Sequence, residues 1–234
     1  MNVAMVTGAS AGLGKAIANA LAERGWTLII DARGPDALAD TVAGLPMGTN
    51  VVAIPGDVSD PVHRDALVHA AYELGRLDLL VNNASHLGPS PLPRLAAHPS
   101  DELRRVYEVN VFAPIALSQS SMKLLKAASG TIVNISSDAA VEAYEGWGGY
   151  GSAKAALDQA TAVLAAEHPD LRVYAFDPGD MRTAMHQRAY PGEDISDRPE
   201  PQTVAPSFIR LVIERPPSGR YRASDLPAAV EVQA

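Results

Sequence analysis

Tyr150 and Lys154 are the two side chains with the clearest capacity for acid–base chemistry. Their spacing of four residues places both on one face of a helix, one turn apart. An unperturbed tyrosine has a pKa of about 10, which is too high for efficient acid–base catalysis at neutral pH. A neighbouring ammonium group favours the phenolate and so lowers that pKa. The alternative is an ordinary surface pair, as most Tyr/Lys pairs on helices are.

A glycine-rich turn near the N-terminus is a candidate phosphate site. The apolar run Val3–Thr7 leads into Gly8, Gly12 and Gly14, and a helical stretch follows from Lys15. Glycines permit positive φ angles and a close approach of the backbone to a pyrophosphate, whose charge faces the helix N-terminus. The spacing GxxxGxG is looser than the general dinucleotide pattern GxGxxG, and a purely structural turn is the alternative. Its place between the first strand and the first helix favours the phosphate site.

Short β-branched apolar runs alternate with longer Ala- and Leu-rich stretches of helical period. The expected strands are Val3–Thr7, Thr27–Asp31, Val51–Ile54, Leu77–Val81, Thr131–Ile135 and Leu171–Phe176, and the expected helices lie near 14–24, 36–43, 61–74, 101–127 and 152–167. Strands that are apolar throughout are typical of a sheet buried on both faces. The alternation predicts one domain over 1–234, a Rossmann-like, doubly wound α/β fold with a mostly parallel sheet of about seven strands. Ligands would bind at the carboxyl ends of these strands.

A series of short motifs follows the glycine-rich turn along almost the whole chain. The positions are Thr7-Gly8 with Gly12 and Gly14, Asp57 within Gly56-Asp57-Val58, Asn82-Asn83-Ala84, Asn110, Ser137 after Ser136, Tyr150 with Lys154, and Pro178-Gly179 with Thr183. In order and spacing this series resembles the classical short-chain dehydrogenase/reductase (SDR) family. Ser85 departs from the family, which usually has glycine there, and its Cβ narrows the expected cofactor site or forces a different φ.

The resemblance implies hydride transfer between a nicotinamide and a carbonyl or alcohol, with Asn110, Ser137, Tyr150 and Lys154 as the catalytic residues. Tyr150 would supply the proton, and Ser137 would hydrogen-bond the developing oxyanion. Lys154, with the positive ring of the oxidised nicotinamide, would lower the tyrosine pKa and would also hold the nicotinamide ribose. Asn110 would anchor a water that links Lys154 to solvent.

The end of the second expected strand predicts NADP(H) rather than NAD(H), although NAD(H) remains possible. In this fold an acid at that point hydrogen-bonds the ribose hydroxyls and repels a 2′-phosphate. By the family's count the acid position lies 18 residues after Gly14 and is filled by Ala32, and Arg33 follows. A guanidinium can bind the phosphate, while Asp31 would point to the opposite face of the strand end. The full set of expected cofactor contacts is Gly8, Ser10, Gly12, Leu13, Gly14, Ala32, Arg33, Asp57, Val58, Asn83, Ala84, Tyr150, Lys154, Pro178, Gly179 and Thr183.

Loops beside the catalytic positions are expected to contact the substrate, above all through His86, Trp147 and Met185. These side chains suggest an apolar or aromatic carbonyl compound, and a core role is an equal alternative for Trp147. The long polar stretch 179–201 is expected to be a lid, with a plain surface loop as the alternative. The Ala-rich stretch Ala153–Ala166 allows close helix packing, and the resemblance implies a homodimer or homotetramer.

Composition narrows the other possibilities. The 234 residues carry 19 basic and 27 acidic side chains, a net charge of −8 that disfavours a general binder of nucleic acids or anionic membranes. The sequence has no cysteine and its histidines follow no metal-binding pattern, so no metal site is expected. The beginning of the chain does not resemble a signal peptide, and no apolar run is long enough to cross a membrane. A cytoplasmic location is expected.

The implied function is an NADP(H)-dependent ketone or aldehyde reductase, and other functions on the same fold compete with it. An NAD-dependent alcohol dehydrogenase lies within the same reaction class. A sugar-nucleotide epimerase of the extended branch carries a larger C-terminal domain, whereas 80 residues follow Lys154 here. A catalytically silent dinucleotide-binding regulator usually lacks the tyrosine or the lysine, and this chain has both.

Overall fold

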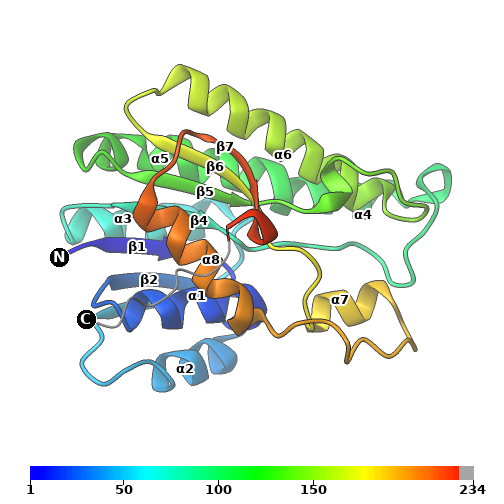
Figure 1. Ribbon diagram of the computed structural model, residues 1–234, viewed down its shortest axis with the longest axis horizontal. Coiled ribbons are helices and arrows are strands. Elements are labelled where there is room, and N and C mark those ends of the chain that lie inside the picture. The colour runs from blue at the N-terminus through cyan, green and yellow to red at the C-terminus, as the bar shows by residue number, and fades with distance from the viewer. Residues whose placement is uncertain (227–234) are drawn as a thin grey trace.

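The computed structural model describes residues 1–226, in which seven strands form one parallel sheet (Figure 1). The strand order is β3-β2-β1-β4-β5-β6-β7, and all neighbouring pairs are parallel. The direction of winding reverses between β1 and β4, which is where a doubly wound sheet binds its ligand. The predicted fold class is confirmed. The strands are Val3–Val6 (β1), Thr27–Ala32 (β2), Val51–Pro55 (β3), Leu79–Asn82 (β4), Thr131–Ile135 (β5), Arg172–Asp177 (β6) and Gly219–Arg222 (β7).

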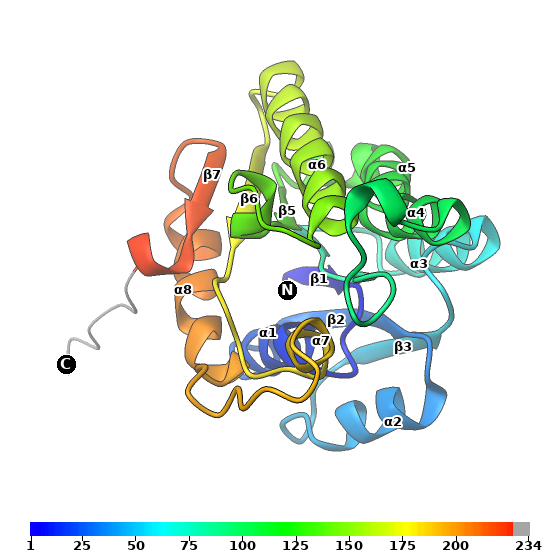
Figure 2. The same ribbon diagram turned by 90° about the vertical axis from the view of Figure 1, so that its right-hand side faces the viewer.

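Helices cover both faces of the sheet (Figure 2). One face carries α1 (Gly12–Ala22), α2 (Pro35–Ala43) and α8 (Pro201–Glu214), and the other carries α3 (Pro61–Glu73), α4 (Ser100–Tyr107), α5 (Ala113–Ala127) and α6 (Gly148–Glu167). A short helix, α7 (Ala184–Ala189), lies beyond the carboxyl ends of the strands (Figure 1). None of the helices within residues 1–226 is long and apolar enough to cross a membrane.

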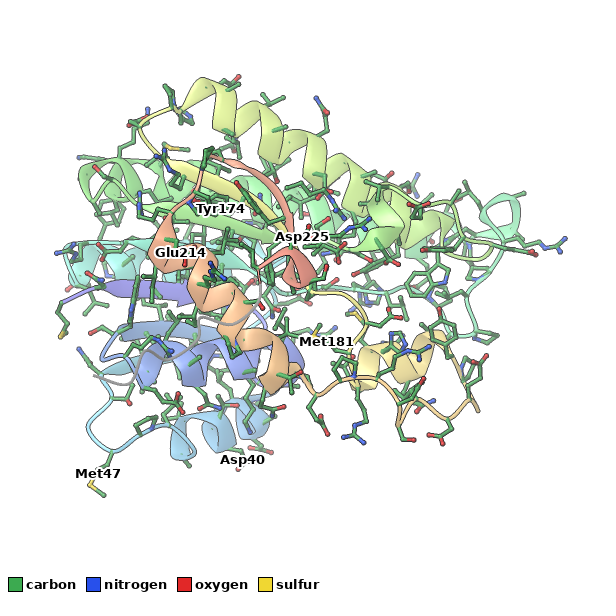
Figure 3. All side chains as sticks on the ribbon, in the orientation of Figure 1. Asp40, Met47, Tyr174, Met181, Glu214 and Asp225 are labelled. Carbon is green, nitrogen blue, oxygen red and sulfur yellow. The ribbon has the colours of Figure 1, made fainter. Side chains whose placement is uncertain are left out.

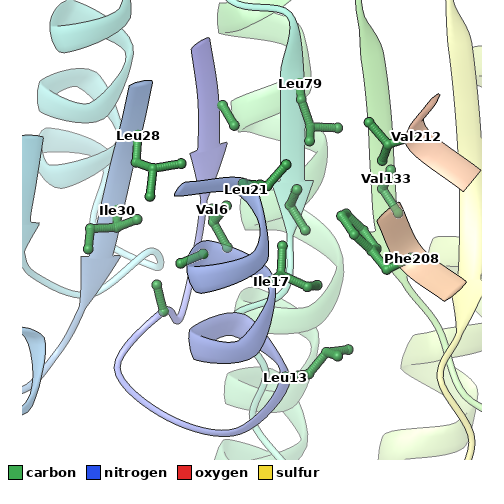
Figure 4. Close-up of a cluster of buried hydrophobic side chains, with 14 of the residues drawn as sticks. Val6, Leu13, Ile17, Leu21, Leu28, Ile30, Leu79, Val133, Phe208 and Val212 are labelled. Atoms are coloured by element: carbon green, nitrogen blue, oxygen red, sulfur yellow. The ribbon is translucent and has the colours of Figure 1, made fainter. Parts of the chain in front are cut away.

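Two apolar cores hold these layers together. On one face Ile17 and Leu21 of α1 and Phe208 of α8 pack in one cluster with Val6 and Val133 of the sheet (Figure 4). The other core joins the opposite face of the same strands to α3 and α5, through buried side chains that include Met5, Ile29, Leu67, Leu117 and Leu125. Every residue of β1, β2, β4 and β5 is buried, as the continuous apolar runs predict.

The stretch 101–127, expected as a single helix, is interrupted in the structure. A π-helical turn over Glu108–Phe112 separates α4 from α5. Pro114 has no N–H, so the regular α-helical hydrogen bond to the carbonyl of Asn110 cannot form. Such π turns often mark functional sites, and this one holds Asn110 in the interior.

The C-terminal third of the chain contains elements that the sequence pattern does not single out. Helix α8 and strand β7 are both absent from the predicted set, although each completes a layer of the fold. The stretch 179–201, expected to be irregular, includes the helix α7. Helix α8 packs against α1 and the sheet, β7 pairs with β6, and α7 packs through Met185 and Ala189 against a separate cluster that contains Tyr150.

Candidate active site

A cavity of about 570 Å³ opens at the carboxyl ends of the strands. Its walls come from the loops that follow β1 to β6 and from α6 and α7. All of the predicted site residues border it except Gly14 and Asn110, which lie one layer behind the wall. The fold thus brings together residues that are up to 182 positions apart in the sequence, from Gly8 to Tyr190.

The glycine-rich turn is packed so closely that larger residues do not fit. Gly8 has a φ of +67°, and a Cβ there would lie 2.9 Å from Cα of Ala84. A Cβ on Gly14 would lie 2.4 Å from the carbonyl oxygen of Gly8, so Gly14 supports the turn from behind. Thr7 Oγ1 accepts hydrogen bonds from the N–H groups of Asn83 and Ala84, both at 3.0 Å. These contacts fix the N-terminus of α1 at the cavity wall, where its dipole suits a pyrophosphate.

One end of the cavity has the features of a 2′-phosphate site. The Asp31 carboxylate is buried and accepts hydrogen bonds from the Gly8 N–H at 2.7 Å and from Nε2 of His63 at 2.9 Å. Burial raises the pKa of Asp31, against these two bonds. Ala32 presents no charge, and the exposed Arg33 forms no hydrogen bond or ion pair within residues 1–226. Arg33 is therefore a free cation in the cavity lining at this end, Arg105 of α4 also acts on Asp57 there, and the neighbouring Asp31 is bound by Gly8 and His63.

Asp57 lies beside the same end of the cavity, after β3. Its Oδ1 accepts hydrogen bonds from the N–H and the hydroxyl of Ser59, at 2.9 and 2.7 Å. Burial opposes the charge, but these bonds hold the pKa of Asp57 below its usual value. Asp57 is therefore an anionic acceptor, with Val58 beside it in the cavity wall. Such an acceptor suits the exocyclic amine of an adenine.

The tyrosine, lysine and serine predicted to be catalytic meet at the opposite end. Tyr150 and Lys154 lie on α6, with Nζ of Lys154 5.5 Å from the centroid of the Tyr150 ring. Lys154 is 1% exposed, and its ammonium donates to the carbonyl of Ile135 at 2.7 Å. Ser137 follows β5, and its hydroxyl donates to Oδ1 of Asp138 at 2.9 Å. Tyr150 and Ser137 share the cavity wall, as one substrate carbonyl would require.

Burial dominates the titration of this pair. It raises the pKa of Tyr150 to about 12 and lowers that of Lys154 to about 8. The Ser85 hydroxyl favours the phenolate, and the charge of Asp138 disfavours it. In the protein chain by itself burial therefore outweighs any lowering of the tyrosine pKa by Lys154, and that lowering stays a prediction. The ammonium lies against the ring and donates to the Ile135 carbonyl, so it does not offset the burial of the phenol.

Asn110 supports the loop after β4 with its side chain. Oδ1 accepts hydrogen bonds from the His86 N–H and the Ser85 hydroxyl, both at 2.9 Å, and Nδ2 donates to the His86 carbonyl at 2.8 Å. Both lone-pair positions of Oδ1 are thereby used. A water held by Asn110, as predicted, would have to use its remaining N–H or its backbone carbonyl.

The segment after β6 forms the third wall of the cavity. Pro178, Gly179 and Met181 line it before α7 begins, and Figure 3 shows Met181 at this junction. Thr183 caps α7 by accepting a hydrogen bond from the His186 N–H at 3.1 Å. The predicted roles of Pro178, Gly179 and Thr183 in cofactor binding are compatible with these positions.

Aromatic and acidic side chains surround the catalytic end. The Trp147 ring centroid lies 5.8 Å from that of Tyr150 and 6.0 Å from that of Tyr190. Nε2 of His186 is buried and has no hydrogen-bond partner in the part of the chain that the structure describes. His86, Trp147 and Met185, the predicted substrate contacts, border the cavity here, as do the acids Asp138 and Asp180.

Three polar side chains that organise the site were missed in the sequence. His63 hydrogen-bonds the Asp31 carboxylate. Gly56 is the sequence feature that could have indicated this, because a Cβ on Gly56 would lie 2.2 Å from the His63 ring. Asp138 holds the Ser137 hydroxyl and follows it directly in the chain. Arg220 of β7 donates to the Ser137 carbonyl and to Asp177 at 2.9 Å, and to Asp158 at 3.0 Å. No local pattern marks Arg220, because its partners are at least 43 residues away.

Fold and site together define a dinucleotide-dependent oxidoreductase of the doubly wound class, and known proteins agree. The short chain dehydrogenase family model matches residues 2–194. Sepiapterin reductase of Meriones unguiculatus is 32% identical over 201 residues, which cover 80% of this chain and 77% of that protein. The rhamnolipids biosynthesis 3-oxoacyl-(acyl-carrier-protein) reductase of Pseudomonas aeruginosa is 36% identical over 194 residues, 78% of this chain and 74% of that protein.

A solved structure extends the likeness to three dimensions. The alcohol dehydrogenase from the archaeon Thermococcus sibiricus, complexed with 5-hydroxy-NADP, superposes with a TM-score of 0.84 at 28% identity and covers 95% of each chain. The chain therefore belongs to the short-chain dehydrogenase/reductase family. It is an oxidoreductase that interconverts C=O and CH–OH groups with NAD(P).

Proposed function

We propose that this protein is an NADP(H)-dependent reductase of ketones or aldehydes. The observation that carries the proposal is the layout of one cavity, which has the unpaired Arg33 at one end and Tyr150 beside Ser137 at the other. The close-packed turn at Gly8 and Gly14 between these ends fits the pyrophosphate of a dinucleotide. The two curated relatives described above are both reductases by name, which favours the direction of reduction.

The catalytic side chains divide the work of carbonyl reduction. A bound nicotinamide supplies the hydride that the carbonyl carbon receives. Tyr150 donates its proton to the carbonyl oxygen, and its raised pKa keeps that proton in place at neutral pH until the oxygen becomes basic. Ser137 turns its hydroxyl from Asp138 toward the same oxygen and stabilises the developing charge. The ammonium of Lys154, held near the ring, stabilises the phenolate that remains.

Three positions support NADP(H) as the preferred cofactor. The guanidinium of Arg33 is free to form charge-assisted hydrogen bonds with a 2′-phosphate. Ala32 stands where an acid would repel this phosphate. Both carboxylate oxygens of the neighbouring Asp31 already accept hydrogen bonds, one from Gly8 and one from His63. The structural relative from Thermococcus sibiricus is itself complexed with an NADP derivative.

The catalytic end of the cavity suits an uncharged substrate with an apolar or aromatic body. Trp147 and Tyr190 offer ring surfaces, and Met185 offers a flexible apolar side chain. The lysine that lines this end of the cavity is Lys154, and its ammonium already donates to the Ile135 carbonyl. Asp138 and Asp180, which also line this end, are acidic. These two acids would repel a carboxylate or phosphate on the substrate.

Turnover assays with a matched pair of variants test the reaction. Purified enzyme is assayed for NADPH oxidation with a panel of ketones and aldehydes, which a silent regulator would not reduce. Tyr150→Phe should lower kcat at least about 100-fold, since general acid catalysis contributes about 10²–10⁴-fold. Its affinity for NADPH should stay within about twofold of wild type, because the ring still packs. Tyr72→Phe, an exposed change on α3, is the control and should keep full activity.

A second pair of variants tests the cofactor. We expect kcat/KM to favour NADPH over NADH in the wild type. Arg33→Ala should lower kcat/KM for NADPH by about tenfold or more, the equivalent of about 1.4 kcal/mol, and should leave NADH nearly unchanged. Arg24→Ala, at the exposed end of α1, is the control. A wild type that prefers NADH would refute the NADP(H) assignment but would not contradict the proposed reductase activity.

A further inference from the structure

The wall of the cavity contains a buried histidine nitrogen that nothing in the chain satisfies. Within residues 1–226, two side chains of the cavity lining have a buried polar atom without a hydrogen bond, His86 and His186, and in both the atom is Nε2. Nε2 of His86 has the carboxylate of Glu102 3.5 Å away. For Nε2 of His186 the described residues offer neither a hydrogen bond nor an ion pair, although this side chain is only 9% exposed. Leaving such an atom unpaired is costly, so we expect its partner to be a ligand of the cavity.

Helix α7 holds the His186 ring near the catalytic end. The His186 N–H donates to Oγ1 of Thr183 at 3.1 Å, and its carbonyl accepts a hydrogen bond from the Tyr190 N–H at 3.2 Å. The His186 ring centroid lies 4.9 Å from that of Tyr190. The Tyr190 ring in turn contacts Trp147, and Trp147 contacts Tyr150. Two aromatic rings therefore lead from His186 to the catalytic tyrosine, and a substrate body that packs on them extends from one to the other.

The neighbour of the other ring nitrogen indicates what Nε2 offers to a ligand. Nδ1 of His186 lies 3.8 Å from Oδ1 of Asp180. An ionised carboxylate only accepts hydrogen bonds, so it favours the neutral tautomer that carries its proton on Nδ1. Nε2 then has the lone pair and is an acceptor. Asp180 also lines the cavity and adds acceptor oxygens beside the ring. A ligand that pairs with this part of the wall therefore needs an O–H or N–H group.

We propose that His186 determines substrate specificity, because its Nε2 accepts a hydrogen bond from a hydroxyl or N–H group on the body of the carbonyl substrate. The inference rests on the proposed reductase function and narrows its substrates to aromatic or apolar ketones and aldehydes that carry such a donor. Tyr150 and Ser137 bind the reacting carbonyl, and His186 binds the donor, so the substrate is oriented at two points. An analogue without the donor leaves Nε2 buried and unpaired, and the site therefore discriminates against it.

Matched substrates test the hydrogen bond in the full-length enzyme. The probes are meta- and para-hydroxyacetophenone, the two corresponding methoxyacetophenones, and acetophenone itself. Hydroxyl and methoxy groups have similar electronic effects on the ketone, but only the hydroxyl is a donor. At one of the two ring positions, kcat/KM of the wild type for the hydroxy ketone should exceed that for the methoxy ketone and for acetophenone by about tenfold or more. Acetophenone shows that this preference is not a matter of the bulk of the methyl ether.

Two variants of His186 assign the preference to its nitrogen. His186→Phe keeps an aromatic ring and removes the acceptor, so the preference should fall to within about twofold, while kcat/KM for acetophenone stays within about threefold of wild type. His186→Gln places an amide oxygen near the position of Nε2 and should retain part of the preference. His69→Phe, an exposed change on α3, is the control and should keep the wild-type ratio. A wild type without the preference, or a His186→Phe variant that keeps it in full, would overturn the proposal.

Calorimetric binding of amides that the enzyme does not reduce gives a second readout without turnover. In the presence of NADPH, the hydroxybenzamide with its hydroxyl at the preferred ring position should bind the wild type about tenfold more tightly than its methyl ether. Both should bind His186→Phe about equally. Equal affinities in the wild type, or no binding of either amide, would overturn the role of His186 even if ketones are reduced. Failure of the proposed function looks different, because the wild type would then reduce none of the ketones, while the amide affinities would still decide whether His186 binds the donor.

Discussion

Nε2 of His63 lies 2.9 Å from the carboxylate of Asp31, and both side chains are buried. Together with the Gly8 N–H, His63 occupies both oxygens of the acid that stands two positions before Arg33. These two bonds use half of the acceptor positions of the Asp31 carboxylate, so a ribose hydroxyl would have to share the acid with Gly8 and His63. We therefore propose that His63 of α3 contributes to cofactor choice by binding the acid that would otherwise oppose a 2′-phosphate.

His63→Ala is expected to lower both stability and NADPH affinity. The free energy of unfolding should fall by about 2 kcal/mol, since a buried polar group that loses its partner costs about 1–3 kcal/mol. The released carboxylate would repel the 2′-phosphate, so the dissociation constant of NADPH should rise more than that of NADH. Urea unfolding and cofactor titration measure the two effects. His69→Ala, on the exposed side of the same helix, should change neither, and equal losses in both variants would contradict the assignment.

The charge of Asp138 gives the pH profile a predictable direction. Burial raises the pKa of Tyr150 to about 12, and the Asp138 carboxylate acts in the same direction. Alcohol oxidation needs the phenolate, so its rate should rise with pH, whereas carbonyl reduction needs the neutral phenol and should decline at high pH. Asp138→Asn removes the charge, which makes the phenolate easier to form and lowers the pKa of Tyr150. The rising limb of oxidation should therefore move to lower pH by about half a unit.

The matched control for this prediction is Glu142→Gln, which removes an exposed carboxylate from the same loop. Its profile should overlay that of the wild type. A shift of the Asp138→Asn profile to higher pH would mean that the hydrogen bonds of Asp138 to Ser137 and Tyr144 outweigh its charge.

Arg220 couples the last strand of the sheet to the catalytic serine. Its guanidinium joins Asp158 of α6, Asp177 of β6 and the carbonyl of Ser137. Arg220→Met keeps the length of the side chain and removes these bonds, leaving the buried Asp177 without its closest cation. We expect a loss of about 2 kcal/mol or more in the free energy of unfolding and a lower kcat, because Ser137 is less firmly placed. Arg222→Met, 3.8 Å from Asp177 and exposed, should have a much smaller effect in both assays.

The sequence predicted the fold and most of the cavity lining because both depend on local patterns. Apolar runs and glycine spacing are read within a few residues, and motif order places Tyr150, Lys154 and Ser137 at strand and helix ends. The raised pKa of Tyr150 was not predictable, since it comes from burial by segments far apart in the chain. His63 and Arg220 were missed for the same reason, because their partners are 32 or more residues distant.

Helix α7 is tied to the loop on the far side of the cavity by two hydrogen bonds. Nη2 of Arg188 donates to the Gly88 carbonyl at 2.9 Å, and the Ser90 hydroxyl donates to the Arg188 carbonyl at 2.6 Å. These bonds span about 100 residues of sequence and bridge the catalytic end, where Trp147 and Tyr190 also touch. We therefore propose that 179–201 is a lid, with Arg188 as the contact that favours its closed position.

Arg188→Ala should loosen this lid without touching the reacting groups. KM for the carbonyl substrate should rise about three- to tenfold with kcat nearly unchanged, because the closed position contributes to substrate binding more than to the chemical step. Hydrogen exchange supplies the direct measurement: amides of α7 should exchange faster in the variant, and in the wild type they should slow when cofactor and a substrate analogue are both bound. Arg104→Ala, an exposed change on α4, controls for loss of surface charge. Equal exchange of α7 with and without ligands would identify 179–201 as a plain surface segment, because a lid that closes over substrate must protect its own backbone when the substrate is present.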